Sequence, residues 1–136
     1  MVDVTNKQPR IIYFGTPELA VEPLQTLLQT NTYKICAVVT QTDKPAGRGQ
    51  QLAPTPLKRF ALENGLRVLQ PTNLKKISRE GEALSLPEGT EATREFVEFL
   101  NAHQPFDAFI VVAYGKIIPA TLLHYPRHGI LNIHIS

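Results

Sequence analysis

Short apolar runs rich in β-branched and aromatic residues alternate along this chain with segments whose apolar residues recur at helical spacing. The runs are expected to form strands at 10–14, 34–40, 67–70, 107–113 and 129–135. Alternation of this kind requires a crossover between successive strands, and such crossovers are right-handed and place helices against the sheet. The sequence therefore predicts an α/β fold: a doubly wound, Rossmann-like, mostly parallel sheet with helices on both faces.

The segments between these runs predict helices at 17–30, 55–64, 90–103 and 119–124. At the first helix, Thr16 is expected to be the N-cap and Pro17 the first helical residue, and Pro23 should either kink the helix or start its main part. Two further segments lack a clear pattern. We expect residues 41–54 to form a long polar loop and residues 71–89 to form a solvent-facing connection.

Composition limits the class of protein. With 136 residues, 43% of them hydrophobic, the chain is expected to form one globular domain. Its longest apolar stretch, Ala108 to Tyr114, is far shorter than the ~18 residues of a membrane span, and its first nine residues are not signal-like. We therefore expect a soluble cytoplasmic protein with no membrane partner. The lone Cys36 is expected to be buried, and no metal-ligand spacing is present, so no metal site is predicted.

Polar segments follow the predicted strands. In parallel sheets ligands bind at the carboxyl ends of the strands, so the segments "GTPE", "TQTDKPAGRGQQ", "YGK" and "NIHIS" should share one edge. Gly15 and Thr16 form a turn before a helix, where an anion could bind, although the three-glycine dinucleotide pattern is absent. That turn is either a ligand contact or only a tight turn. Tyr114 and Lys116 either serve a pocket or cover the sheet edge.

Basic residues are concentrated after the second predicted strand. This stretch contains one acidic residue, Asp43, and four basic residues: Lys44, Arg48, Lys58 and Arg59. Its local charge exceeds the net charge of the whole chain, which is only +2. Glycines flank Arg48, which exposes its guanidinium for contact with phosphate. The alternative is an ordinary solvated loop. Because no aromatic residues are interleaved with these charges, stacking on single-stranded bases is not expected.

The last predicted strand, "GILNIHIS", carries a polar side chain at every second position. Asn132, His134 and Ser136 should share one face, with Ile133 and Ile135 on the other. If that polar row is buried, hydrogen-bonding groups must lie opposite it. The row is either structural or a pair of functional groups, an amide donor and an imidazole, at the edge where ligands bind.

Four segments together resemble a known family. In order, "IIYFGTPELAVEPLQTLL", "VVTQTDKPAGRGQQLAPTPLK", "VVAYGKIIP" and "GILNIHIS" are similar to segments of the folate-dependent formyltransferases, especially those that act on methionyl-tRNA. The resemblance implies transfer of a formyl group from 10-formyltetrahydrofolate to the α-amino group of initiator methionyl-tRNA in translation initiation. It also implies a monomeric parent enzyme that needs no metal.

The resemblance also assigns roles to individual residues. Asn132 would donate to the developing oxyanion, and His134 would polarise the same oxygen or manage the proton. The segment expected to border the folate pocket is Val112, Ala113, Tyr114, Gly115, Lys116, Ile117 and Ile118. Those expected near the substrate are Gly15, Thr16 and Ser136, and Lys44 and Arg48 match the tRNA-binding loop. Ile135 stands where the family usually has a small residue.

The resemblance implies that residues 1–136 are an amino-terminal domain, incomplete at its carboxyl end. The family continues with a Leu-Leu-Pro loop, a catalytic Asp and a carboxyl-terminal barrel, so we expect residues 1–136 alone to be inactive. Three alternatives remain open: a formyltransferase for an amino-sugar nucleotide, a non-catalytic folate- or RNA-binding module, and an unassigned Rossmann-like ligand-binding domain.

Overall fold

A five-stranded sheet organises the protein. The computed structural model describes residues 8–134, and every strand pair of this sheet is parallel. In spatial order the strands are β5 (Val68–Leu69), β2 (Lys34–Val39), β1 (Arg10–Gly15), β8 (Ala108–Val112) and β9 (Ile130–Ile133). From β1 the chain adds β2 and then β5 on one side, and later adds β8 and then β9 on the other side of β1. β9 therefore forms one edge of the sheet. The predicted α/β fold with a parallel sheet is confirmed.

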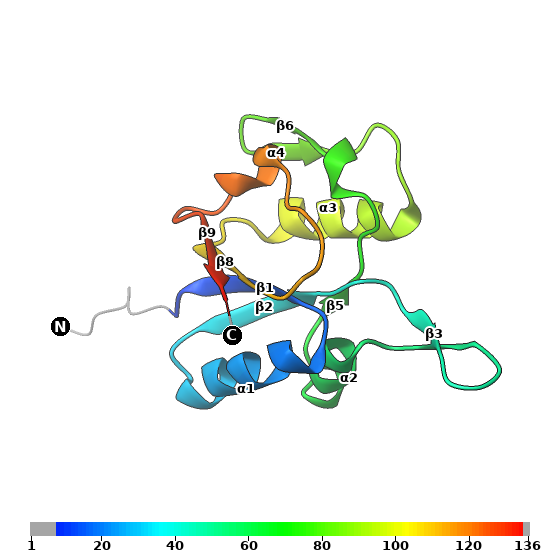
Figure 1. The fold of residues 1–136 in the computed structure, drawn as a ribbon. Coiled ribbons are helices and arrows are strands. Elements are labelled where there is room, and N and C mark those ends of the chain that lie inside the picture. Colours follow the sequence, from blue (N-terminus) through cyan, green and yellow to red (C-terminus); the bar gives the residue numbers. More distant parts are fainter. Residues whose placement is uncertain (1–7, 135–136) are drawn as a thin grey trace.

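Helices cover both faces of the sheet (Figure 1). On one side lie η1 (Glu18–Ala20), α1 (Val21–Thr30) and α2 (Pro56–Glu63), and on the other lie η2 (Leu74–Lys76), α3 (Glu91–His103) and α4 (Ala120–Leu123). Residues of β1 alternate between the two cores: Tyr13 packs in the cluster with Leu24 and Leu57, and Phe14 packs in the cluster with Phe96 and Phe109. This alternation explains why the central strands β1 and β2 are apolar after their first residues, Arg10 and Lys34.

Two of the three longer helices, α2 and α3, begin at a threonine N-cap. Thr55 and Thr90 each accept a hydrogen bond from the backbone three residues later, as N-caps do. The prediction that Thr16 caps the first helix is wrong, because its hydroxyl donates instead to the carbonyl oxygen of Tyr114, 2.7 Å away. Pro23 lies in the first turn of α1, where its missing N–H costs no hydrogen bond, so it marks the start of that helix.

Residues 41–54 are not a loop throughout. They contain an antiparallel hairpin of β3 (Lys44–Ala46) and β4 (Gln51–Ala53), which projects from the rest of the domain (Figure 1). The sequence hides these strands because β3 is exposed along its length and β4 along most of it. With no buried face, the apolar alternation that identifies a strand is missing.

The expectation that residues 71–89 form a solvent-facing connection is only partly right, because the segment is mostly exposed but also contributes to the core. It includes a second hairpin, β6 (Ser78–Glu80) and β7 (Ala83–Ser85), that lies over the α3 side of the sheet. Its apolar side chains join the core cluster: Leu74, Ile77, Leu84 and Leu86. They occur singly among charged residues, so they produce neither a helical nor a strand period. None of the helices within residues 8–134 has the length and apolar character needed to cross a membrane.

Candidate functional site at the carboxyl edge of the sheet

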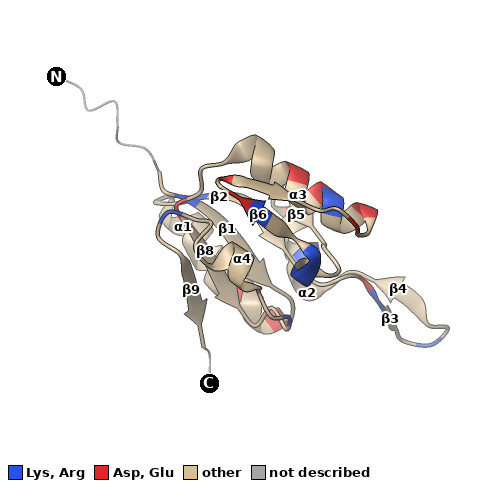
Figure 2. Ribbon diagram, turned by 90° about the horizontal axis from the view of Figure 1, so that it is seen from above, with Lys and Arg blue, Asp and Glu red and all other residues tan. Residues whose placement is uncertain are grey.

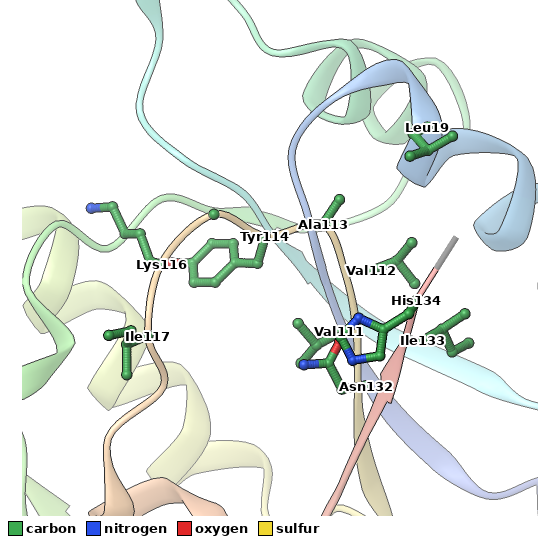
Figure 3. A pocket seen from close by; sticks show the side chains of 11 residues that line it. Leu19, Val111, Val112, Ala113, Tyr114, Lys116, Ile117, Asn132, Ile133 and His134 are labelled. Atoms are coloured by element: carbon green, nitrogen blue, oxygen red, sulfur yellow. The ribbon is translucent and has the colours of Figure 1, made fainter. Parts of the chain in front are cut away.

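A pocket of about 420 Å³ lies where β8 and β9 end (Figure 3). Three segments far apart in the sequence form its wall. The lining residues are Leu19, Val111, Val112, Ala113, Tyr114, Gly115, Lys116, Ile117, Asn132, Ile133 and His134. Its place at the carboxyl edge of a parallel sheet is the one that the fold class predicts for a ligand. The structure therefore brings "YGK" and residues 132–134 together at this edge.

Asn132 and His134 lie on one side of β9, and Ile133 lies on the other (Figure 3). Asn132 is in register with Val111 of β8, and Ile133 is in register with Val112 and packs against the core. Asn132 and His134 are both exposed, so the polar row is not buried and does not require hydrogen-bonding groups opposite it. Neither has a hydrogen-bond partner within residues 8–134, so both are available to a ligand. Ser136 and Ile135 lie outside the described residues.

Tyr114 anchors the segment between β8 and α4. Its ring is buried and meets the ring of Phe14 edge-on, with centroids 5.3 Å apart. Burial raises the pKa of the Tyr114 phenol well above its usual range, so the group stays neutral. The Tyr114 carbonyl oxygen accepts two hydrogen bonds, from Thr16 Oγ1 at 2.7 Å and from Gln41 Nε2 at 2.8 Å. The side chain of Tyr114 is thus a core group, and its backbone shapes the pocket.

The segment from Tyr114 to Ile118 has unpaired backbone donors, and its residues 114–117 line the pocket. The N–H groups of residues 114–118 donate to no carbonyl or side chain within the described part of the chain. Gly115 has φ +85°, a conformation that favours glycine. Lys116 Nζ donates to the carbonyl oxygen of Thr72 at 2.5 Å, which ties this segment to the chain after β5. Ile118 does not line the pocket and packs against the core instead.

Gly15 and Thr16 do not line the pocket. They contact two residues of its wall, Val112 and Tyr114. Gly15 is buried, and a Cβ there would lie 2.7 Å from Cβ of Ala20 and 2.8 Å from the carbonyl oxygen of Val112. The residue of this turn that lines the pocket is Leu19, which the sequence analysis did not identify. The feature that points to Leu19 is the 50% exposure of this large apolar side chain, at the start of a helix at the carboxyl edge of the sheet.

The basic residues lie apart from the pocket lining. Lys44 is on β3 and Arg48 is in the turn that follows it; both are exposed, and Figure 2 shows blue along β3 and at the hairpin tip. At the root of the hairpin, Asp43 accepts from Gln70 Nε2 at 2.8 Å and pairs with Lys58 at 3.0 Å. These two donors, Gln70 first, lower the pKa of Asp43. Asp43 is therefore paired with Lys58, and within residues 8–134 neither Lys44 nor Arg48 takes part in an ion pair.

Comparison with known proteins identifies the family. Residues 9–136 match the family described as formyl transferase. The chain belongs to the formyl transferase family. It is 46% identical over 126 residues to the methionyl-tRNA formyltransferase of Thermosynechococcus vestitus, covering 93% of this chain and 33% of that relative. It is 43% identical over 127 residues to the methionyl-tRNA formyltransferase of Methylobacillus flagellatus, covering 93% and 35%. The chain thus spans about a third of the length of these curated relatives.

Membership in the formyl transferase family narrows the alternatives. The resemblance seen in the sequence is confirmed, and an unassigned Rossmann-like domain no longer describes the chain. Within residues 8–134 of this formyl transferase chain, no group of three His, Cys, Asp or Glu side chains could hold a metal ion. Cys36 is half-buried rather than fully buried, with its Sγ 3.8 Å from the carbonyl oxygen of Lys34.

Proposed function

We propose that the protein to which this chain belongs transfers a formyl group from 10-formyltetrahydrofolate to the α-amino group of initiator methionyl-tRNA. The observation that carries the proposal is the meeting of Asn132, His134 and the 112–117 segment at one pocket. Relatives 46% and 43% identical to the chain bear the name methionyl-tRNA formyltransferase, which supports this choice of substrates.

The pocket suits a reduced folate in size and chemistry. A volume of about 420 Å³ lies within the range of small-molecule sites, ~300–1,000 Å³. The free backbone N–H groups of residues 114–117 can hydrogen-bond a heterocycle that carries its own acceptors, and Ile117 and Leu19 offer apolar contact. The folate would supply an activated formyl group. Val112, Ala113, Tyr114, Gly115, Lys116 and Ile117 would hold it, with Ile118 supporting them from the core.

Asn132 and His134 supply charge stabilisation and proton transfer. An α-amino group has a pKa of ~8, so a useful fraction is neutral near pH 7.5 and can attack a carbonyl carbon without a covalent enzyme intermediate. The Asn132 amide would donate to the negative charge that develops on the formyl oxygen. The His134 imidazole would donate to the same oxygen when protonated, or accept the proton that the amine loses. The bond between the formyl carbon and the folate nitrogen would then break, which leaves the formyl group on the α-amino group and releases tetrahydrofolate.

The exposed cations of the hairpin would contact the tRNA. Lys44 and Arg48 lie on a hairpin that projects from the domain (Figure 2), and neither residue lines the pocket. Phosphate contacts from such an arm position a nucleic acid without reading its sequence. Gly15 and Thr16 would act indirectly, by fixing the turn and the Tyr114 carbonyl beside the substrate. Ser136 remains a proposed substrate contact outside the described residues.

A product assay tests the proposal. The full polypeptide that carries this chain is given 10-formyltetrahydrofolate with either charged initiator tRNA or an amino-sugar nucleotide, and the formylated product is identified by mass spectrometry. We expect formylmethionyl-tRNA, and we expect Asn132→Ala and His134→Ala to suppress it. Formylation of the sugar nucleotide alone would favour the amino-sugar alternative. Folate binding without transfer to either acceptor would favour a non-catalytic module.

A further inference from the structure

Gln41 connects three separate parts of the chain. It follows β2, just before the basic hairpin. Its side-chain Nε2 donates to the carbonyl oxygen of Tyr114 at 2.8 Å, and its backbone N–H donates to Thr16 Oγ1 at 3.4 Å. Its own carbonyl oxygen accepts from Gln70 Nε2 at 3.1 Å. One half-buried residue therefore contacts the pocket segment, the turn after β1 and the chain after β5.

Gly115 makes the contact between Gln41 and the pocket segment possible. A Cβ at residue 115 would collide with Nε2 of Gln41, and no other group except the Gln41 amide carbon lies within 4 Å of that position. The left-handed backbone at Gly115 turns the chain so that the neighbouring Tyr114 carbonyl faces Gln41. The absence of a side chain at residue 115 and the direction of the Gln41 amide are thus parts of the same arrangement.

The far side of Gln41 is also held. Gln70 uses the same Nε2 to reach the Gln41 carbonyl and Oδ1 of Asp43, at 3.1 and 2.8 Å. Asp43 in turn pairs with Lys58 of α2 at 3.0 Å. These bonds fix the backbone of Gln41 relative to the sheet and to α2. Its side chain therefore starts from a rigid position when it reaches toward Tyr114.

We propose that Gln41 is a positioning residue, which sets the direction of the backbone N–H groups of Gly115 to Ile117 through the Tyr114 carbonyl. This inference rests on the proposed function, because those N–H groups are the ones offered to the folate. A ligand loses affinity when the protein must first order the segment that binds it. Gln41 removes that cost by holding the segment in its binding arrangement before the ligand arrives.

The Tyr114 carbonyl has a second donor, which separates positioning from stability. Thr16 Oγ1 also donates to this oxygen, so loss of the Gln41 amide does not leave a buried acceptor unpaired. We therefore expect little loss of global stability on replacing Gln41. What changes is the freedom of the segment to rotate about the remaining Thr16 bond, and this should appear as weaker folate binding.

The first experiment compares Gln41→Leu with Gln25→Leu in the full polypeptide. Gln25 is an exposed residue of α1 with no side-chain hydrogen bond within residues 8–134, so it controls for the same chemical change. The probe is 5-formyltetrahydrofolate, a stable reduced folate, titrated by calorimetry. We expect Gln41→Leu to raise its Kd by about five- to tenfold, the worth of one net hydrogen bond. We expect lower NMR order parameters for the backbone amides of residues 115–117, and no change in either quantity for Gln25→Leu.

The second experiment uses Gln41→Glu as a titratable replacement of the same size. An ionised carboxylate cannot donate to the Tyr114 carbonyl, whereas a protonated one can. Folate binding by this variant, relative to the unvaried protein, should be weak at pH 7.5 and partly restored at pH 5. The charged groups nearby are Asp43, Lys58 and Lys116, and all three are also present in Gln41→Leu, which therefore controls for their contribution. Gln41→Leu should show no recovery.

The outcomes separate this inference from the proposed function. If the unvaried protein does not bind the reduced folate, the proposed function fails, and the backbone order parameters of residues 115–117 alone decide whether Gln41 holds the segment. If the unvaried protein binds but Gln41→Leu keeps its Kd and its order parameters, the inference is overturned and the proposed function stands. A loss of binding accompanied by global unfolding of Gln41→Leu, with no recovery for Gln41→Glu at pH 5, also overturns it.

Discussion

Gly15 at the end of β1 is packed directly against Val112 at the end of β8. The two residues are in register in the parallel ladder, and a Cβ on Gly15 would lie 2.8 Å from the carbonyl oxygen of Val112. A second neighbour, Cβ of Ala20, would be 2.7 Å away. Because Val112 begins the pocket segment, the missing side chain at Gly15 helps to set where that segment leaves the sheet.

Gly15→Ala should therefore destabilise the protein by about 1–3 kcal/mol, the usual cost of overpacking a tight site. Urea unfolding monitored by circular dichroism measures the change. The double variant Gly15→Ala/Ala20→Gly removes one of the two collisions and should recover part of the loss. Unchanged stability of Gly15→Ala would show that Gly15 has open space beside it, contrary to this packing.

Asn132→Ala should reduce the rate of formyl transfer far more than it weakens substrate binding. Removal of one oxyanion donor costs ~2.7–4 kcal/mol in the transition state, which corresponds to about a 10²–10³-fold lower kcat. Since Asn132 is exposed, its loss should change the free energy of unfolding by less than about 0.5 kcal/mol. Steady-state kinetics with charged tRNA provide the test. Leu131→Ala, the preceding residue of β9, is the control; an equal loss of kcat in both variants would contradict the role of Asn132.

Leu84→Ala should destabilise the protein by about 2–5 kcal/mol, because this side chain of β7 is only 4% exposed within the α3-side core. Leu62→Ala on α2 is the matched control, since Leu62 is 57% exposed and its truncation should cost little. Chemical denaturation of both variants distinguishes a packed hairpin from a solvent-facing connection. Equal stability of the two variants would indicate that residues 71–89 form a solvent-facing connection, as the sequence predicted.

The strands and helices that the sequence predicts correctly are those with one consistent environment along their length. Strands such as β1 and β8 are covered on both faces, so apart from Arg10 at the start of β1 they carry no charged residue and their apolar run is clear in the sequence. The hairpin β3–β4 has no buried face, and the residues that pack in 71–89 are isolated leucines and an isoleucine. Neither arrangement leaves a period in the sequence, because tertiary contacts rather than local spacing determine them.

The residues of the candidate site also fall into those that the sequence could predict and those that it could not. Asn132, His134 and the 112–117 segment could be placed at one edge, because the carboxyl ends of parallel strands must meet there. Leu19 and Gln41 could not, since an exposed leucine and a loop glutamine carry no motif. Gln41 acts through a backbone carbonyl 73 residues away in sequence, a partner that only the folded chain supplies.

Lys44→Ala/Arg48→Ala should weaken binding of initiator tRNA and make it less sensitive to salt. Each lost phosphate contact lowers the slope of log K against log salt by about 0.7–0.9. Affinity measured between 50 and 200 mM KCl provides the slope, and reduced-folate binding should not change, because neither residue lines the pocket. Lys75→Ala/Lys76→Ala removes two exposed charges from η2 and should leave the slope nearly intact. An equal decrease in both double variants would indicate a general charge effect and no specific arm.

Asp43→Asn should flatten the acid side of the stability profile. Hydrogen bonds from Gln70 and Lys58 lower the pKa of Asp43 in the folded protein, so folding favours its ionised form. That contribution is fully present above the unfolded pKa of ~3.9 and disappears as pH falls through the folded pKa. The difference in the free energy of unfolding between the unvaried protein and Asp43→Asn should therefore shrink as the pH is lowered from 6 to 3. Because the Asp43 and Lys58 side chains are 28% and 20% exposed, 1 M NaCl should weaken the effect without abolishing it. Glu88→Gln, at an exposed site, is the control, and a difference for Asp43→Asn that stays constant from pH 6 to 3 would contradict the linkage.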